Sequence, residues 1–224
     1  MTSPPPTPIL LATGNRDKQE QFRQILAGLP FSALTPCDVA LWAPLEESGD
    51  THEAIARDKA SRWSSASAML AIASDGGLVI PALGPHWESR YTRRFAGPAA
   101  DNAVRLSRLL ELMRPYRGED RRASWVEALA LAYRGRVLVS WELAGGVGYL
   151  DEQPPDGPLP EFWVFSVWRF PQFGAAYSQL TEAQRESIDD HWGRLRRLVR
   201  RYLTSTFVPP RHSLTTASTE TTEN

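Results

Sequence analysis

Hydrophobic and polar positions alternate along most of the chain in patterns typical of short strands and amphipathic helices. An apolar run at 9–12 predicts a buried strand, and the charge-rich segment 16–26 that follows has apolar residues at helical spacing. Two further helices are predicted at 51–64 and 101–113, because each begins with a capping residue, a threonine and an aspartate respectively. The first half of the chain therefore predicts helices that alternate with buried strands.

The second half is richer in strand signals. Segment 69–83 predicts a strand, a polar tip and a second strand, and segment 124–143 predicts a hairpin that turns near Arg134–Gly135. Residues 145–160, rich in glycine, proline and acids, predict a loop, and the apolar, aromatic run 162–170 predicts another strand. This mixture favours an α/β or α+β fold around a long mixed sheet.

The closing helix and the two ends complete the predicted organisation. Segment 181–203 begins with a capping-box pattern and carries a leucine-rich stripe. Residues 1–7 predict a disordered arm, 8–205 a folded domain, and 206–224 a disordered polar tail.

Composition excludes several classes of protein. The 224-residue chain has a formal net charge of -1, which gives no general reason to expect nucleic acid or a membrane surface as a partner. Cys37 is its single cysteine, so neither an intramolecular disulfide nor a cysteine-based zinc site is possible. No apolar run is long enough to span a bilayer, and the first residues lack signal-peptide features. We therefore expect a cytoplasmic enzyme or binding protein.

A phosphate site is predicted where the first strand passes into the first helix. Thr13, Gly14 and Asn15 place small polar residues at the helix N-terminus, where backbone N–H groups favour an anion. Lys18 adds a full positive charge within the first turn. The alternative is an ordinary N-capped helix with a surface lysine, since the sequence is not a Walker A loop.

Two acidic segments offer oxygen ligands for a divalent cation. Segment 46–50 contains Glu47 just before a helix that carries Lys59 two turns later, although acids there also stabilise a helix dipole. Asp75 follows an apolar strand and precedes Gly76, which suits a metal ligand or a proton acceptor. The competing interpretation is a simple Asp-Gly turn.

These motifs, in this order, resemble those of the inosine triphosphate pyrophosphatase family. The resemblance covers roughly residues 8–205, is strong up to about residue 113 and is weak beyond about residue 145. The matching segments are Thr-Gly-Asn with a lysine at 13–18, Glu-Ser-Gly-Asp-Thr at 47–51 with Lys59, the Asp75 segment at 73–78, Ala-Leu-Gly at 82–84 and Arg-Phe-Ala-Gly at 94–97.

The resemblance implies a long central mixed sheet with flanking helices that form two lobes around a cleft, commonly in a homodimer. It implies Mg²⁺-dependent hydrolysis of a nucleoside triphosphate, of the ITP or XTP type, to the monophosphate and pyrophosphate. Glu47 and Asp75 would lie near the metal, and Asp75 would accept the proton of the attacking water. The implied substrate-binding residues are Thr13, Gly14, Asn15, Lys18, Lys59, Gly76, Phe162, Trp163, Phe165, Arg185 and His191.

The sequence departs from the family pattern near the expected catalytic acid. Ser74 stands where relatives have a second aspartate, and Gly76 stands where they have a serine. Ile55 replaces a helix asparagine. The missing acid at Ser74, together with an arginine that is lost at Trp192, favours, as an alternative, a nucleotide-binding protein with weak or no catalytic activity.

A second set of departures lies in the segments that contact the base in relatives. Trp163 replaces a flexible glycine, Phe165 replaces an aspartate that contacts the base edge, and Trp192 replaces an arginine beside His191. His191 itself is equally well explained as a structural histidine on a helix. Aromatic residues offer stacking surface but no polar readout of a base. We therefore predict a retained phosphate end with altered or relaxed base preference; a nucleic-acid binder is a distant third possibility.

Overall fold

The computed structural model describes residues 5–41, 48–153, 156–188 and 190–207. Most of the predicted N-terminal arm and of the predicted tail lies outside these residues. Regular structure in the described residues extends from Thr7 to Phe207. Thr7 already belongs to a strand and pairs with Phe31, and the last helix continues to Phe207, whose ring packs edge-on against Phe31 at 6.1 Å.

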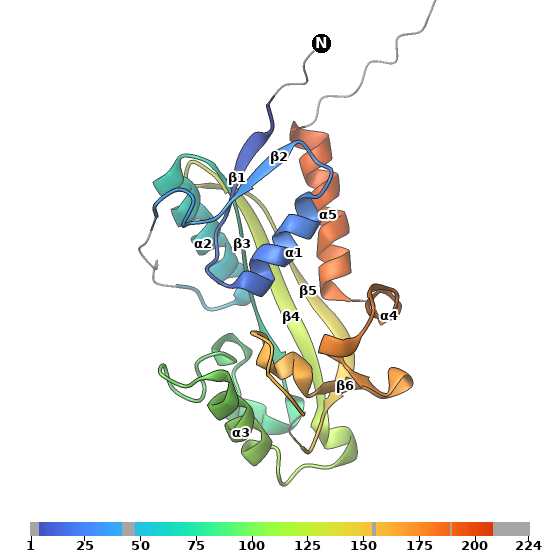
Figure 1. Cartoon of the computed structure of the whole chain (residues 1–224). Helices are drawn as coiled ribbons and strands as arrows, with labels where there is room; N and C mark the ends of the chain where they lie inside the picture. The colour runs from blue at the N-terminus through green and yellow to red at the C-terminus, as the bar shows by residue number, and fades with distance from the viewer. Residues whose placement is uncertain (1–4, 42–47, 154–155, 189, 208–224) are drawn as a thin grey trace, which may run out of the picture.

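A mixed sheet runs through the whole molecule, which confirms the predicted fold class. Its strands, in spatial order, are β2 (Phe31–Leu34), β1 (Thr7–Leu11), β3 (Leu70–Val79), β4 (Arg122–Tyr133), β5 (Arg136–Leu150), β6 (Trp168–Phe170) and β7 (Ala175–Ala176). β1 is parallel to both of its neighbours, whereas every pair from β3 to β7 is antiparallel. The long strands β3, β4 and β5 connect two lobes (Figure 1).

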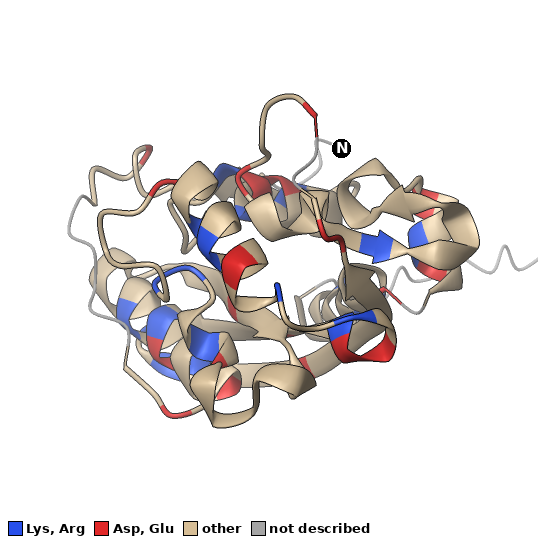
Figure 2. Ribbon diagram, turned by 90° about the horizontal axis from the view of Figure 1, so that it is seen from below, with Lys and Arg blue, Asp and Glu red and all other residues tan. Residues whose placement is uncertain are grey.

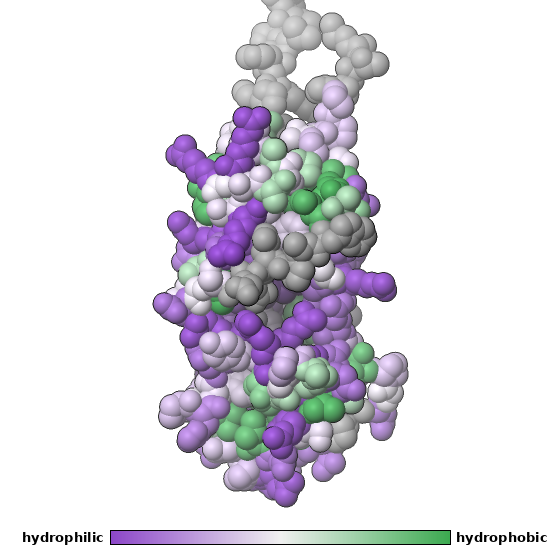
Figure 3. Space-filling view, turned by 90° about the vertical axis from the view of Figure 1, so that its left-hand side faces the viewer, coloured by the Kyte–Doolittle hydropathy of each residue, from purple (hydrophilic) through white to green (hydrophobic). Residues whose placement is uncertain are grey.

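Five α-helices flank the sheet in the described part of the chain. They are α1 (Arg16–Leu26), α2 (His52–Ser67), α3 (Asn102–Leu112), α4 (Glu182–Ser187) and α5 (His191–Phe207). α1, α2 and α5 lie in the lobe that contains β1 and β2, and α3 lies in the other lobe with β6 (Figure 1). Figure 3 shows mostly hydrophilic side chains on one side of the molecule, with small apolar patches on each lobe. No helix among the described residues is long and apolar enough to cross a membrane.

The pleat of the sheet assigns each helix to a face. Ile9 and Leu11 of β1 are buried with α1 and α5, while the alternate residue, Leu10, is buried with α2. The α2 side is lined by alanines from the helix and from β3 and β4, and Ala56 and Ala60 of α2 are fully buried there. Successive side chains of a strand point to opposite faces of the sheet, so the position of each polar residue in β3 decides which helix it faces.

The predicted polar tip at residues 74–77 is wrong. β4 pairs with β3 without interruption from Leu70 to Val79, and Asp75 lies opposite Ala128 in the middle of the ladder. Asp75 is therefore an interior strand residue with a helix above it, not a turn residue at the end of a strand.

Three other sequence predictions need correction, while the hairpin is confirmed. β5 continues to Leu150, so the predicted loop at 145–160 is strand in its first part, where glycines allow close packing. The aromatic run 162–170 forms a 3₁₀ turn at Trp163–Ser166 and only then the short strand β6. The closing helix is divided into α4 and α5. Arg134 and Gly135 turn the β4–β5 hairpin with φ of 47° and 80°, as its two-residue loop requires.

The alanine layer beneath α2 generates a stability prediction. Ala60→Leu adds volume where α2 packs directly on the sheet, so we expect the free energy of unfolding to fall by about 1–3 kcal/mol. Ala66→Leu, at an exposed position of the same helix, is the matched control and should change it by less than about 0.5 kcal/mol. Urea unfolding of both variants measures the difference; equal stability of the two would contradict close packing at Ala60.

Candidate active site

A cavity of about 560 Å³ is lined by segments from both lobes. It brings together most of the residues predicted from the sequence, which come from the β1–α1 connection, from α2, from the middle of β3 and from the 3₁₀ segment after residue 160. These residues are Thr13, Gly14, Asn15, Lys18, Lys59, Asp75, Gly76, Phe162 and Trp163.

The N-terminus of α1 forms one wall of the cavity. Asn15 caps the helix, because its side-chain oxygen accepts a hydrogen bond from the Lys18 backbone N–H at 2.9 Å, and Thr13 Oγ1 accepts one from Asn15 N–H at 3.1 Å. The next backbone N–H, that of Arg16, donates to the Glu161 carboxylate at 3.1 Å. The N-terminus of α1 is therefore capped, and one of its backbone N–H groups binds an anion. That anion is the carboxylate of Glu161.

Asp75 occupies the α2 face of β3, where polar side chains surround its carboxylate. Lys59 Nζ lies 3.3 Å from Oδ1, and His52 Nδ1 lies 2.6 Å from Oδ2. The other ring nitrogen of His52 is 2.9 Å from the Ser89 hydroxyl. Burial raises the pKa of Asp75, but the hydrogen bond from His52 and the charges of Lys59 and Lys18 outweigh it and hold the pKa below its ordinary value. Asp75 is thus ionised at neutral pH.

Glu127 occupies the opposite, α1 face, and the sequence prediction missed it. Its side chain is fully buried, and Oε1 lies 2.9 Å from Lys18 Nζ while Oε2 accepts a hydrogen bond from Trp125 Nε1 at 2.8 Å. The available signal was a single acid in the apolar strand at 124–132. That signal indicates a buried charge but does not reveal its partner, because the contact joins β4 to a helix far away in the sequence.

Gly76 lies directly opposite Glu127 in the β3–β4 ladder. A Cβ atom at this position would lie 2.0 Å from Glu127 Oε2 and 2.7 Å from the carbonyl oxygen of Val126. Gly77 is similarly crowded, because its Cβ would meet the carbonyl oxygen of Ser89 at 1.9 Å. The two glycines therefore allow close approach of neighbouring groups and do not make a turn.

Four arginines add positive charge to the cavity wall, and the sequence analysis did not propose them as ligands. Arg90, Arg93 and Arg94 come from the segment after β3, and Arg105 comes from α3. Arg105 Nε is held by the carbonyl oxygen of Arg93 at 2.7 Å. Figure 2 shows Lys and Arg residues as well as Asp and Glu on both lobes.

Only part of the predicted base-binding set lines the cavity. Phe165 lies behind Phe162, with their rings stacked at 4.9 Å. Arg185 packs over the ring of Tyr177 at 5.3 Å. These two residues, and His191 with them, do not line this cavity. Phe165 and Trp192 pack into the core.

His191 is a buried residue at the start of α5. Its ring stacks against those of Trp125 and Tyr177, with centroids 6.3 and 6.0 Å apart, and neither ring nitrogen has a hydrogen-bond partner among the described residues. Burial lowers its pKa, so the imidazole is neutral. Trp192 also faces the core, against Phe22.

Glu47 and Asp75 are the two predicted metal ligands. Glu47 lies outside the described residues, and the described ones contain no group of three or more acidic, histidine or cysteine side chains that could hold a metal ion. Asp75 alone offers carboxylate oxygens to the cavity from β3. Such a donor suits Mg²⁺, which proteins usually hold through one or two carboxylates together with substrate phosphates.

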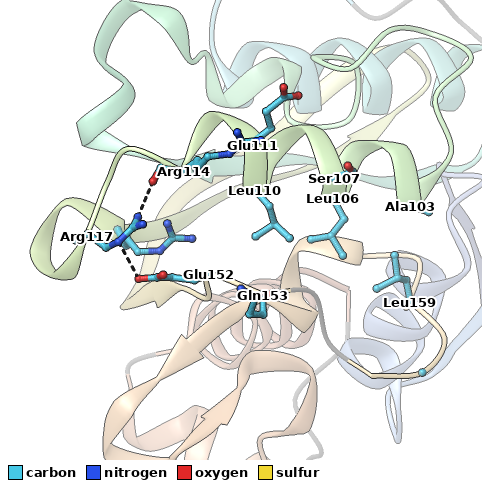
Figure 4. Close-up of a pocket in the computed structure, with 12 residues that line it drawn as sticks. Ala103, Leu106, Ser107, Leu110, Glu111, Arg114, Arg117, Glu152, Gln153 and Leu159 are labelled. Atoms are coloured by element: carbon cyan, nitrogen blue, oxygen red, sulfur yellow. Dashed lines mark hydrogen bonds and ion pairs between the residues drawn. The ribbon is translucent and has the colours of Figure 1, made fainter.

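A second cavity, of about 830 Å³, lies between α3 and residues 152–153 and 157–159 (Figure 4). Leucines form part of its wall, and an ion pair of 3.5 Å joins Arg117 to Glu152 beside it. It is larger than the first cavity, but it contains none of the residues predicted from the sequence. The predicted residues meet instead at Asp75, beside two lysines and the N-terminus of α1, so we assign the chemistry to that cavity.

The fold agrees with comparisons to known proteins. The model of the Ham1 family matches residues 9–150, and the chain belongs to this family. Solved Ham1 proteins from Coxiella burnetii and Staphylococcus aureus superpose with TM-scores of 0.72 and 0.70 at 24% and 22% identity. Each superposition covers 89% of this chain and 99% of the other, and at this identity they show the shared fold.

Curated relatives are similar over most of the chain. A dITP/XTP pyrophosphatase from Thermus thermophilus is 34% identical over 193 residues, which are 80% of this chain and 92% of that protein. Another dITP/XTP pyrophosphatase, from Geobacter sulfurreducens, is 32% identical over 88% of this chain and 96% of its own length. The family resemblance inferred from the motifs is thus confirmed.

Crowding at Gly76 generates the prediction for this site. We expect Gly76→Ala to lower the free energy of unfolding by more than about 2 kcal/mol, because the new methyl group must displace both a buried carboxylate and a backbone carbonyl. Gly14→Ala is the control, since no atom lies within 4 Å of its Cβ position. Thermal unfolding of both variants is the measurement. A Gly76 variant as stable as the Gly14 variant would exclude the contact between Gly76 and Glu127.

Proposed function

We propose that this protein hydrolyses a nucleoside triphosphate to the monophosphate and pyrophosphate in the cavity at Asp75. The observation that carries the proposal is the convergence of an ionised carboxylate, two lysines and a helix N-terminus in one cavity of a Ham1-family chain. The relatives named dITP/XTP pyrophosphatase support the same class of reaction.

The charges around the cavity suit a polyphosphate. A nucleoside triphosphate carries close to four negative charges, and Lys18, Lys59 and the nearby arginines offset them while holding the chain of phosphates in place. Bound Mg²⁺ would be held by Asp75 and Glu47 and would neutralise further phosphate charge. Binding the phosphates from several sides aligns the α-phosphorus for attack and orients pyrophosphate as the leaving group.

Asp75 is the proton acceptor in this proposal. Its carboxylate is ionised, and Lys59 and His52 fix both of its oxygens. A water molecule that attacks the α-phosphorus must lose a proton, and a fixed carboxylate beside it receives that proton. The hydrogen bond between His52 and Ser89 in turn holds the imidazole in its orientation.

Two aromatic residues mark the proposed base end of the site. Phe162 and Trp163 line the cavity, and the polar side chains expected to read a base edge are not part of its lining. Stacking on an aromatic ring discriminates weakly between bases, whereas a buried polar group left unpaired costs about 1–3 kcal/mol. We therefore propose a base preference that differs from, or is broader than, that of a strict ITP or XTP enzyme.

A pyrophosphate-release assay over ITP, XTP, dITP and the common nucleoside triphosphates, with Mg²⁺, tests the proposal. We expect turnover of at least one nucleotide and a loss of about 100-fold or more in Asp75→Asn, which cannot accept the proton. Asp120→Asn, at an exposed position before β4, is the control and should retain full activity. Absence of turnover with every nucleotide, or an unaffected Asp75 variant, would refute the enzymatic assignment.

A nucleotide-binding protein without activity is the second candidate. It is favoured by Ser74 in place of a second acid and by the internal partners that already occupy Lys18, Lys59 and Asp75. Calorimetry with a non-hydrolysable nucleotide separates the two candidates, because binding without turnover supports this one. A homodimer, a cytoplasmic location and the absence of nucleic-acid binding stay predictions from the sequence.

A further inference from the structure

The ion pair between Lys18 and Glu127 lies beneath the wall of the candidate active site. Lys18 lines the cavity, but only 11% of its side chain is exposed, and the side chain of Glu127 is not exposed at all. The carboxylate therefore reaches the cavity only through the lysine. A ligand that contacts Lys18 contacts a cation whose negative partner is already in place.

Glu127 is held in this position from three sides. Lys18 Nζ donates a hydrogen bond to Oε1 at 2.9 Å, and the indole N–H of Trp125 donates one to Oε2 at 2.8 Å. On the third side Gly76 leaves the room that Oε2 needs, since any Cβ there would overlap the carboxylate. The pleat adds a further constraint: Glu127 shares the α1 face of β4 with Leu129, while Asp75 faces α2. The two carboxylates thus lie on opposite faces of the sheet.

The fixed negative charge has two effects on a phosphate bound at Lys18. It orients the lysine, whose ammonium group has three donors and can give one to Glu127 and the others to a phosphate. It also repels the phosphate across a short distance in a poorly solvated region, where screening by water and salt is weak. The second effect grows with the number of phosphate charges, whereas the first does not.

We propose that Glu127 is a specificity-determining positioning residue that offsets the charge of Lys18 and so limits how tightly the site binds polyphosphate. The inference rests on the proposed function, since it concerns the phosphate end of that site. Glu127 lowers the affinity for a triphosphate more than for a diphosphate. By the same repulsion it weakens the hold on pyrophosphate, the product that the reaction must release.

Calorimetry on the full chain tests the inference with three ligands: inorganic pyrophosphate and two non-hydrolysable inosine nucleotides, a diphosphate and a triphosphate. In Glu127→Gln we expect the affinity for pyrophosphate and for the triphosphate to rise by about tenfold, and the ratio of triphosphate to diphosphate affinity to rise with them. Damage to the fold would weaken binding, so an increase is a result that a structural role alone does not produce.

Two further variants complete the design. Glu20→Gln changes the net charge by the same amount on α1, but 60% of that side chain is exposed, so affinities should stay within about twofold of the native values. Glu127→Asp keeps the charge and withdraws it from Lys18 by one methylene, so it should give a smaller increase. It measures the same effect if the glutamine variant does not fold.

The outcomes separate this inference from the proposed function. If the native chain binds these ligands and the Glu127 variants bind them equally well or more weakly, the inference is overturned and the proposed function stays intact. If neither the native chain nor Glu20→Gln binds pyrophosphate or nucleotide, the proposed function fails, and the role of Glu127 fails with it. Tighter binding in the Glu127 variants alone supports both.

Discussion

The structure depends on a charged group in the middle of a buried strand. β3 has neighbours on both sides and helices on both faces, yet Asp75 lies at its centre. A carboxylate in such a place is tolerated only when it is paired and hydrogen-bonded, because desolvation of an unpaired charge costs several kcal/mol. Lys59 and His52, both from α2, meet that requirement. These two contacts fix the position of helix α2 relative to the sheet.

The opposite face repeats the arrangement with different residues. Glu127 is charged and fully buried, and Lys18 reaches it from the first turn of α1. Each lysine thus ties one helix to the central strands through a carboxylate, and both lysines border the same cavity. The interactions that hold the two helices in place are the same ones that create a strongly polar, partly enclosed site. In this protein the stability of the fold and the chemistry of the site share residues, so a change to one of them alters both.

The sequence predicted local features well where a single residue determines the conformation. Thr51 and Asp101 cap their helices as expected, because a capping side chain needs only the backbone N–H three residues later. The hairpin at Arg134–Gly135 could likewise be predicted from the two residues of its turn. Family motifs were also informative, since they pointed to Thr13, Lys18, Lys59 and Asp75, which line one cavity, although not to the arginines beside them.

What could not be predicted depends on contacts across the sheet. Gly76 and Gly77 look like turn residues in a sequence, and only the β3–β4 register shows that they make room for side chains and backbone from elsewhere. Glu127 has no local motif, and its partner is 109 residues away. Phe165 and His191 were expected at the cavity because of their alignment with base-contacting segments. Their burial is decided by packing with Trp125 and Tyr177, which no spacing rule reveals.

We propose that paired charges on both faces of the sheet, at Asp75 of β3 and Glu127 of β4, define one polyphosphate site. A crystal structure with Mg²⁺ and a non-hydrolysable nucleoside triphosphate tests it most directly. The account predicts phosphate oxygens within hydrogen-bond distance of both Lys18 and Lys59, with the α-phosphorus on the Asp75 side of the cavity. Nucleotide density in the second cavity, beside α3 and Glu152, or phosphates that contact neither lysine, would contradict it.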